Sequence, residues 1–356
     1  MTTTREDIPG LERAIASDFF TAKVLESDLA RLHRERGDEV RQLAARLRAQ
    51  GIARVFFVGC GGSYALLYSG EYLFNRLTRL PAQALTAYEF TGRASPAVDA
   101  GALVVLASYS GDTEDAVAAL RFARERGATT VAFTKTLDNT MAREASRAIP
   151  YESIALYAAP LLLVYLLALE WARLDGSAQA PALLAALDGL PAALGAVYRA
   201  TEAPARTHAE RLRDATVLYV LAAGSLYGLG YKFALTVFME NIRVHGSIIH
   251  SAEFRHGPNE MLDRNTAPMV VLLAGDEQRE IGERVLAFVR SQGVDAVVFD
   301  AAADAPGLHP LLTPFALLIP LEWFTVYSCA LRGITDLDER IFMGKGILAK
   351  PGSSWP

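Results

Sequence analysis

The chain has 356 residues, 51% of them hydrophobic, and a formal net charge of −5. This length suits two domains with cores of ordinary size, and an acidic balance without a basic run argues against nucleic-acid binding. Cys60 and Cys329 form neither a disulfide framework nor a metal site. The longest strongly apolar stretch, near Leu161, is about a dozen residues, too short to span a membrane. The polar start MTTTREDIPG is unlike a signal peptide, so a cytoplasmic protein is expected.

A glycine-rich turn follows the first predicted strand. After a helical lead over residues 1–50, the apolar run VFFVG at Val55 ends in GCGGS. Gly61 and Gly62, with Ser63 at the mouth, allow close contact between the backbone and a ligand. The spacing matches neither the GxGxxG of dinucleotide folds nor the GxxxxGK[ST] of a P-loop, so no cofactor such as NAD or ATP is expected. Cys60 is interpreted as a small packed residue rather than a reactive thiol.

Hydroxyl side chains gather at the end of the next strand, where ALVVLAS from Ala102 runs into YSGDT and then into a helical pattern. The hydroxyls of Ser108, Ser110 and Thr113, the backbone at Gly111 and the free amides of the helix would hold a phosphate. The alternative is an ordinary helix N-cap with surplus hydroxyls. Because the glycine-rich turn ends a neighbouring strand, both point to the crevice at the carboxyl ends of an open α/β sheet.

The sequence contains an internal repeat. Three strand-like runs recur in order at an offset of roughly 165 residues: VFFVGCGGS as VLYVLAAGS, ALVVLAS as APMVVLLAG, and TTVAFTK as DAVVFDA. This predicts two copies of one βαβ-rich module, over residues 51–200 and 201–340, followed by a tail over 341–356. The second copy ends its later strand in AGDEQ, without hydroxyls, so one complete phosphate site is expected in each chain, built mainly on the first module.

Between the copies, the segment 155–212 has a helical pattern that contains several prolines. Proline in a helix interior removes a hydrogen bond and clashes with the preceding turn. Helices broken at Pro160, Pro181, Pro191 and Pro204 are therefore expected.

Candidate catalytic residues lie in the second half. Residues 232–244 predict an amphipathic helix with Glu240 among apolar neighbours, where a carboxylate is a candidate general base. The motif EFRHGP then places His256 on a loop that could reach into a crevice, and an imidazole exchanges protons near neutral pH. The alternatives are a solvated Glu240 and a capping or packing His256. His245 and His250 are interpreted as structural, and the lack of an HxxxH or HxH pair argues against a catalytic metal.

Together, GCGGS, SYSGDT and the pair of Glu240 with EFRHGP resemble the sugar isomerase (SIS) domain family in its double-domain form. That family includes the isomerase half of glucosamine-6-phosphate synthase and the fructosamine-6-phosphate deglycases. The resemblance covers nearly the whole chain. It implies an α/β fold of two flavodoxin-like modules, each a parallel sheet flanked by helices, and a tight homodimer.

The resemblance also implies roles for the motif residues. Glu240 would move a proton between C1 and C2 of a sugar 6-phosphate. His256 would open the ring or protonate the leaving group, on a loop that reaches into the partner subunit's site. The phosphate would be surrounded by Ser63, Ser108, Tyr109, Ser110 and Thr113.

Departures from the synthase pattern reduce the number of candidate activities. The chain starts MTTTRED, without the cysteine that opens a glutaminase domain, so ammonia made from glutamine in the same chain is not expected. Val237 stands where the synthases place a lysine for Schiff-base chemistry, and this position and Tyr109 are more like the deglycases. Either Lys345 or Lys350 would be the tail residue that enters the site, with Lys345 at the better distance from Arg340; the alternative is a solvated tail lysine.

The predicted function is therefore a deglycase that hydrolyses a 6-phosphorylated Amadori compound to hexose 6-phosphate and a free amine or amino acid. An aldose–ketose phosphosugar isomerase is the alternative, because the same base and acid serve both reactions. A non-catalytic sugar-phosphate sensor would need an output domain, and the roughly 50 residues before Val55 are too few and too acidic for one that binds DNA.

Overall fold

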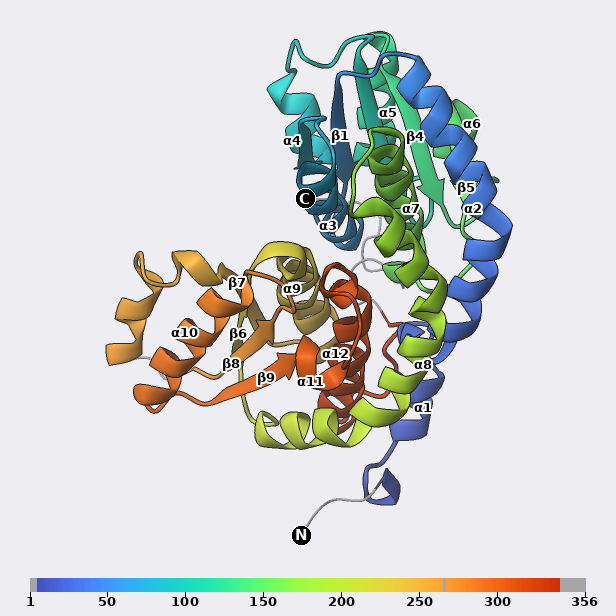
Figure 1. Cartoon of the computed structure of the whole chain (residues 1–356). Coiled ribbons are helices and arrows are strands. Elements are labelled where there is room, and N and C mark those ends of the chain that lie inside the picture. The colour runs from blue at the N-terminus through green and yellow to red at the C-terminus, as the bar shows by residue number, and fades with distance from the viewer. Residues whose placement is uncertain (1–4, 265–266, 340–356) are drawn as a thin grey trace, which may run out of the picture.

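The computed structural model describes residues 5–264 and 267–339 and contains two parallel β-sheets in separate modules (Figure 1). The first sheet has the order β2-β1-β3-β4-β5 and the second the order β7-β6-β8-β9. Their strands are β1 (Arg54–Gly59), β2 (Ala82–Thr86), β3 (Ala102–Ser108), β4 (Thr129–Thr134), β5 (Arg147–Pro150), β6 (Val217–Ala222), β7 (His245–His250), β8 (Met269–Leu273) and β9 (Ala296–Asp300).

The internal repeat is visible in the sheet order. Strands β1 to β4 and β6 to β9 occupy corresponding places in the two sheets, and all neighbouring strands are parallel. This order is that of flavodoxin-like folds, in which ligands bind where the strand order reverses. The predicted fold class is confirmed.

Helices cover both sheets and connect them. The N-terminal lead and first module contain η1 (Arg5–Asp7), α1 (Leu11–Ala16), η2 (Thr21–Val24), α2 (Leu25–Ala49), α3 (Gly62–Leu77), α4 (Ala87–Arg93), α5 (Glu114–Glu125), α6 (Thr140–Glu144) and α7 (Ala158–Leu174). The connection and second module contain α8 (Ala180–Arg211), η3 (Gly224–Leu226), α9 (Tyr227–Tyr231), the π-helix η4 (Lys232–Ile242), η5 (Ser251–Glu253), η6 (Pro258–Asp263), α10 (Arg279–Ser291), α11 (Ala301–Asp304), η7 (Pro310–Leu312) and α12 (Thr313–Ala330).

The expectation of broken helices is wrong for Pro191 and Pro204, which lie inside a continuous helix, whereas Pro160 and Pro181 lie in the first turns of α7 and α8. Helix α8 runs continuously through Pro191 and Pro204. Each proline costs about 3 kcal/mol in a helix interior, but α8 buries an apolar stripe against α12 and α2 that includes Leu187, Leu190 and Leu194. Burying one such side chain contributes about 1.5–3 kcal/mol, so the stripe outweighs the prolines. Helix α8 passes through residue 200 and joins the modules (Figure 1).

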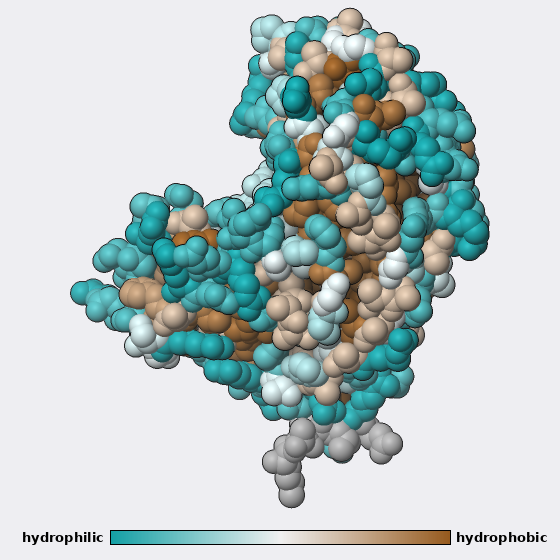
Figure 2. Space-filling view, in the orientation of Figure 1, coloured by the Kyte–Doolittle hydropathy of each residue, from teal (hydrophilic) through white to brown (hydrophobic). Residues whose placement is uncertain are grey.

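Apolar helices form the centre of the molecule. By length and composition alone, α8 and the stretch Pro310–Ala330 could each cross a membrane, but every residue of that stretch's apolar window is buried inside the protein. Helix α12 packs against α8 and η4, so its apolar composition is explained by the core. Hydrophilic residues cover most of the face seen in Figure 2, which is notched between the two modules.

The modules meet where α3 packs on α9. Tyr64 of α3 lies against Tyr231, and Tyr68 lies against Tyr227, each with ring centroids 5.1 Å apart. At Gly228 the backbones approach so closely that a Cβ would lie 2.3 Å from the carbonyl oxygen of Ala65. The first module and the π-helix of the second are therefore held at a fixed separation.

Gly228→Ala tests this contact. The added methyl overlaps backbone rather than a flexible side chain, so we expect the free energy of unfolding to fall by about 1–3 kcal/mol in chemical denaturation. Gly189→Ala in α8 is the matched control, since its Cβ meets no atom within 4 Å and an alanine should stabilise the helix by about 0.5–1 kcal/mol. Equal effects of the two variants would contradict the close contact.

Candidate functional site

A cavity of about 260 Å³ lies at the carboxyl ends of β1 and β3. We call it the cradle. Both predicted loops contribute to it, and none of its lining residues is charged. They are Cys60, Gly62, Ser63, Ala107, Ser108, Tyr109, Ser110, Thr113, Ala116 and Leu156.

The hydroxyl loop after β3 is fixed by its own hydrogen bonds. The Ser108 hydroxyl accepts from the amide of Gly111 at 3.1 Å and shares a hydrogen bond with the Thr113 hydroxyl at 3.2 Å. Gly111 has φ +70°, and a Cβ there would lie 2.1 Å from Asn139, so no other residue fits. Ser108 is buried, whereas Ser110 and Thr113 are exposed.

The helix after this loop has no side-chain cap. Thr113 is the N-cap residue of α5, but its hydroxyl accepts no hydrogen bond from the helix. The first-turn amides therefore remain available to an anion, which the positive end of the helix dipole also favours. This geometry favours a phosphate site over the N-cap alternative.

The glycine-rich turn brings a second helix N-terminus to the same cavity. Gly61 has φ +51° and precedes α3 without a side-chain cap, and a Cβ on Gly62 would lie 3.8 Å from Leu156. Cys60 is partly buried here; burial, with the nearby Asp115 carboxylate, raises the pKa of its thiol. Cys60 is thus held as a neutral thiol that packs in the turn.

The π-helix η4 of the second module packs against the glycine turn. A Cβ on Gly61 would lie 3.9 Å from Cγ2 of Thr236, and Glu240 follows Thr236 by about one turn. Glu240 is exposed, so the expectation of apolar surroundings is wrong. A π-helix closes i to i+5 hydrogen bonds and so redistributes its faces, with Phe233 and Val237 buried while Glu240 emerges.

His256 lies on the loop after β7, away from the cradle lining. Its side chain is exposed and its Nε2 accepts a hydrogen bond from Arg255 Nε at 3.1 Å. The loop does not contribute to the cavity lining of its own chain.

The C-terminal segment approaches η4 before the described part ends. Asn241 Nδ2 donates to the carbonyl of Leu337 at 2.8 Å, and Arg243 forms an ion pair with Glu339 at 3.4 Å. Lys345 and Lys350 lie outside the described residues.

The second copy's equivalent of the cradle is closed by protein. A Cβ on Gly224 would lie 2.7 Å from the side chain of Gln278 and 3.3 Å from the Tyr72 hydroxyl. That hydroxyl donates to Asp276 at 3.3 Å, and Asp276 belongs to the AGDEQ sequence that replaces the hydroxyl loop. Helix α3 of the first module thus covers the second turn.

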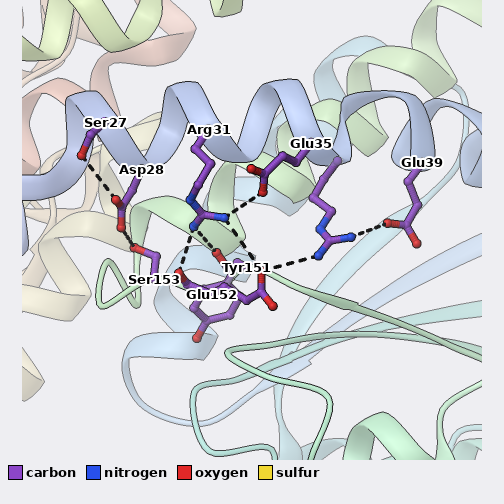
Figure 3. A network of polar contacts seen from close by, with 9 residues as sticks. Ser27, Asp28, Arg31, Glu35, Glu39, Tyr151, Glu152 and Ser153 are labelled. Carbon is purple, nitrogen blue, oxygen red and sulfur yellow. Dashed lines mark hydrogen bonds and ion pairs between the residues drawn. The ribbon is translucent and has the colours of Figure 1, made fainter.

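Helix α2 holds residues 151–156, the segment that ends at the cradle residue Leu156 and that we call the wall (Figure 3). The sequence does not predict this contact. Arg31 Nη2 donates to the carbonyls of Tyr151 at 3.1 Å and Glu152 at 2.9 Å. The Ser153 hydroxyl donates to Asp28 at 2.5 Å. Glu152 has φ +48°, a strained conformation for a residue with a side chain, so these bonds hold a wall that the backbone alone disfavours.

The chain is 33% identical over 323 residues to the fructoselysine 6-phosphate deglycase of Escherichia coli O157:H7, covering 90% of this chain and 92% of that protein. The chain belongs to the SIS domain family. The SIS domain model itself matches residues 49–170.

Further relatives agree with this family. The fructosamine deglycase of Bacillus subtilis (strain 168) is 31% identical over 270 residues, covering 74% of this chain and 82% of that protein. A crystal structure from Bacillus subtilis, provisionally described as a phosphosugar isomerase, has a TM-score of 0.77 at 29% identity, covering 86% of this chain and 96% of that one. The C-terminal domain of glucosamine-fructose-6-phosphate aminotransferase from Francisella tularensis has a TM-score of 0.79 at 19% identity, covering 93% and 98%, and shares the fold.

Arg31→Ala tests the wall. Removing two charge-assisted hydrogen bonds lets residues 151–156 relax, and we expect inorganic phosphate to bind about three- to tenfold more weakly in an equilibrium titration. Arg48→Ala is the control, because Arg48 lies on the same helix and pairs with Asp175 instead. Unchanged phosphate affinity in a folded Arg31→Ala protein would show that the position of the wall does not affect phosphate binding in the cradle.

Proposed function

We propose that the protein is a deglycase that hydrolyses a 6-phosphorylated Amadori compound to a hexose 6-phosphate and a free amine. The observation that carries this proposal is the approach of Thr236 to the glycine turn, where a Cβ on Gly61 would lie 3.9 Å from its Cγ2, since Glu240 follows about one turn later on the same helix. A sugar phosphate held in the cradle would then extend toward Glu240. The deglycase relatives, which match most of the chain, support the same substrate class.

The proposed reaction needs a base, an acid and water. Glu240 removes a proton from C1 of the open-chain ketoamine, and the C2 carbonyl becomes a hydroxyl by taking up a proton from solvent, which gives an enolamine with a C1=C2 double bond. Protonation at C2 moves the double bond to nitrogen and gives an imine at C1. Water adds to C1 and the C1–N bond breaks, with the proton for the departing amine supplied by His256. The nitrogen is already attached to C1, so the buried Val237 in place of a lysine removes nothing that this reaction requires.

We also propose that the enzyme is a homodimer with shared sites. His256 is exposed on a loop outside its own chain's cradle, which suits a residue that serves a partner subunit. In a twofold dimer each loop would complete the other chain's site.

Glu240→Gln tests the base. The amide keeps the size of the carboxylate but accepts no proton, so turnover of a phosphorylated fructosamine should fall by about two to four orders of magnitude with KM nearly unchanged. Glu280→Gln, an exposed glutamate on α10, is the control. A variant that keeps more than about a tenth of the activity would rule Glu240 out as the base.

The reaction itself is tested with a panel of phosphorylated fructosamines in the presence of EDTA. We expect hexose 6-phosphate and amine in equal amounts, and slow or no conversion of fructose 6-phosphate alone. Rapid interconversion of free phosphosugars without amine release from any conjugate would identify an isomerase instead.

Mixed dimers test the shared site. Glu240→Gln and His256→Ala chains, refolded together, should recover roughly a quarter of wild-type activity, because about half the dimers are mixed and half of their sites carry neither lesion. The same variants refolded separately and then combined are the control. Negligible activity in both samples, with mixed dimers verified by tag pull-down, would mean that each site is built within one chain.

A further inference from the structure

The cradle lacks a charged group of its own. A phosphate monoester carries about −1.5 to −2 charges at pH 7, yet every residue that lines the cavity is neutral. Asp112, Glu114 and Asp115 are exposed at the start of α5 and add negative charge to the same region. Two helix dipoles partly offset this field, and a nearby cation would offset it further.

Lys135 is a cation that contacts the cradle residue Tyr109. It directly follows β4, whose last residue, Thr134, pairs with Ser108 at the end of β3. Its Nζ donates to the Tyr109 hydroxyl oxygen at 2.5 Å and lies 4.6 Å from the centre of the Tyr109 ring. Among the residues that the structure describes, no carboxylate forms an ion pair with Lys135.

The wall beside the cradle also holds the backbone of Lys135. The amide of Glu152 donates to the Lys135 carbonyl at 3.0 Å, and the Lys135 amide donates to the Tyr109 carbonyl at 3.4 Å. Because Arg31 holds the Glu152 carbonyl, the same contacts position both Leu156 and Lys135. Lys135 is therefore attached to the hydroxyl loop through both backbone and side chain.

We propose that Lys135, acting through Tyr109, determines the preference of this site for phosphorylated substrates. The Tyr109 oxygen accepts from the ammonium group, which leaves the tyrosine O–H free to donate to a phosphate oxygen. The adjacent positive charge strengthens that donation, because hydrogen bonds that involve charged groups are shorter and stronger than neutral ones. The inference rests on the proposed function, since it assigns a residue to the recognition of that substrate's phosphate.

The experiment compares Lys135→Met, Tyr109→Phe and the double variant, with inorganic phosphate as a competitive inhibitor and a phosphorylated fructosamine as substrate. For Lys135→Met we expect the inhibition constant of phosphate and KM to rise about five- to twentyfold, with kcat within about twofold. Lys135→Arg keeps the charge and should retain most of the phosphate affinity. The double variant should be no weaker than Tyr109→Phe, because the lysine acts through the tyrosine.

Arg126→Met is the matched control, since Arg126 stacks on Phe122 with its guanidinium carbon 3.8 Å from the ring centre, as an ordinary surface cation–π pair. Its phosphate inhibition should equal that of the wild type. Two results would overturn this inference while leaving the proposed function standing. One is an inhibition constant of phosphate for Lys135→Met equal to that of the wild type. The other is a double variant whose loss of phosphate affinity is the product of the losses in the two single variants. A wild-type protein that cleaves phosphorylated and unphosphorylated fructosamines equally well, without inhibition by phosphate, would overturn both.

Discussion

The packing of α3 on α9 fixes where the cradle of the first module lies relative to the second module. Helix α3 starts at the glycine turn, so its N-terminus forms part of the cradle, while its middle contacts Gly228 at backbone distance. Helix η4 continues from α9 and brings Thr236 close to Gly61, about one turn before Glu240. Helix α3 also covers the second module's turn at Gly224 through Tyr72. The same interface therefore forms part of the cradle in the first module and closes the equivalent position in the second.

The duplication explains this asymmetry. Two modules with the same sheet order each have a small-residue turn at the end of their first strand. In the first module the turn faces a loop of hydroxyls, and in the second it faces Asp276 and Gln278. The amides at the start of α5 remain free beside the first turn, whereas the second turn is covered by protein.

The sequence predicts the strands and the cradle because their signals are local. Apolar runs mark buried strands, and hydroxyls between a strand and a helix mark an anion site, whatever lies elsewhere in the chain. The continuity of α8 through Pro191 and Pro204 depends on α12, more than a hundred residues away, and could not be predicted in this way. The π-helix over Lys232–Ile242, where Glu240 is exposed, is likewise not predicted from the local pattern, which indicates an ordinary amphipathic helix.

The sequence also leaves undetermined which residues far apart in the chain lie side by side in the fold. Lys135 lies within the repeated run TTVAFTK, but its contact with Tyr109 follows from the adjacency of β3 and β4. Arg31 lies on a helix far from the cradle in sequence, and only the strained backbone at Glu152 reveals why it matters. Both are charged residues on partly exposed surfaces, a class that sequence patterns assign to solvation.

Calorimetric titration with glucose 6-phosphate, compared with glucose, tests the central claim that one neutral cradle per chain binds the phosphate. The expected result is a single site per chain for glucose 6-phosphate and no measurable binding of glucose at the same concentration. Two sites per chain, or equal binding of both sugars, would contradict it.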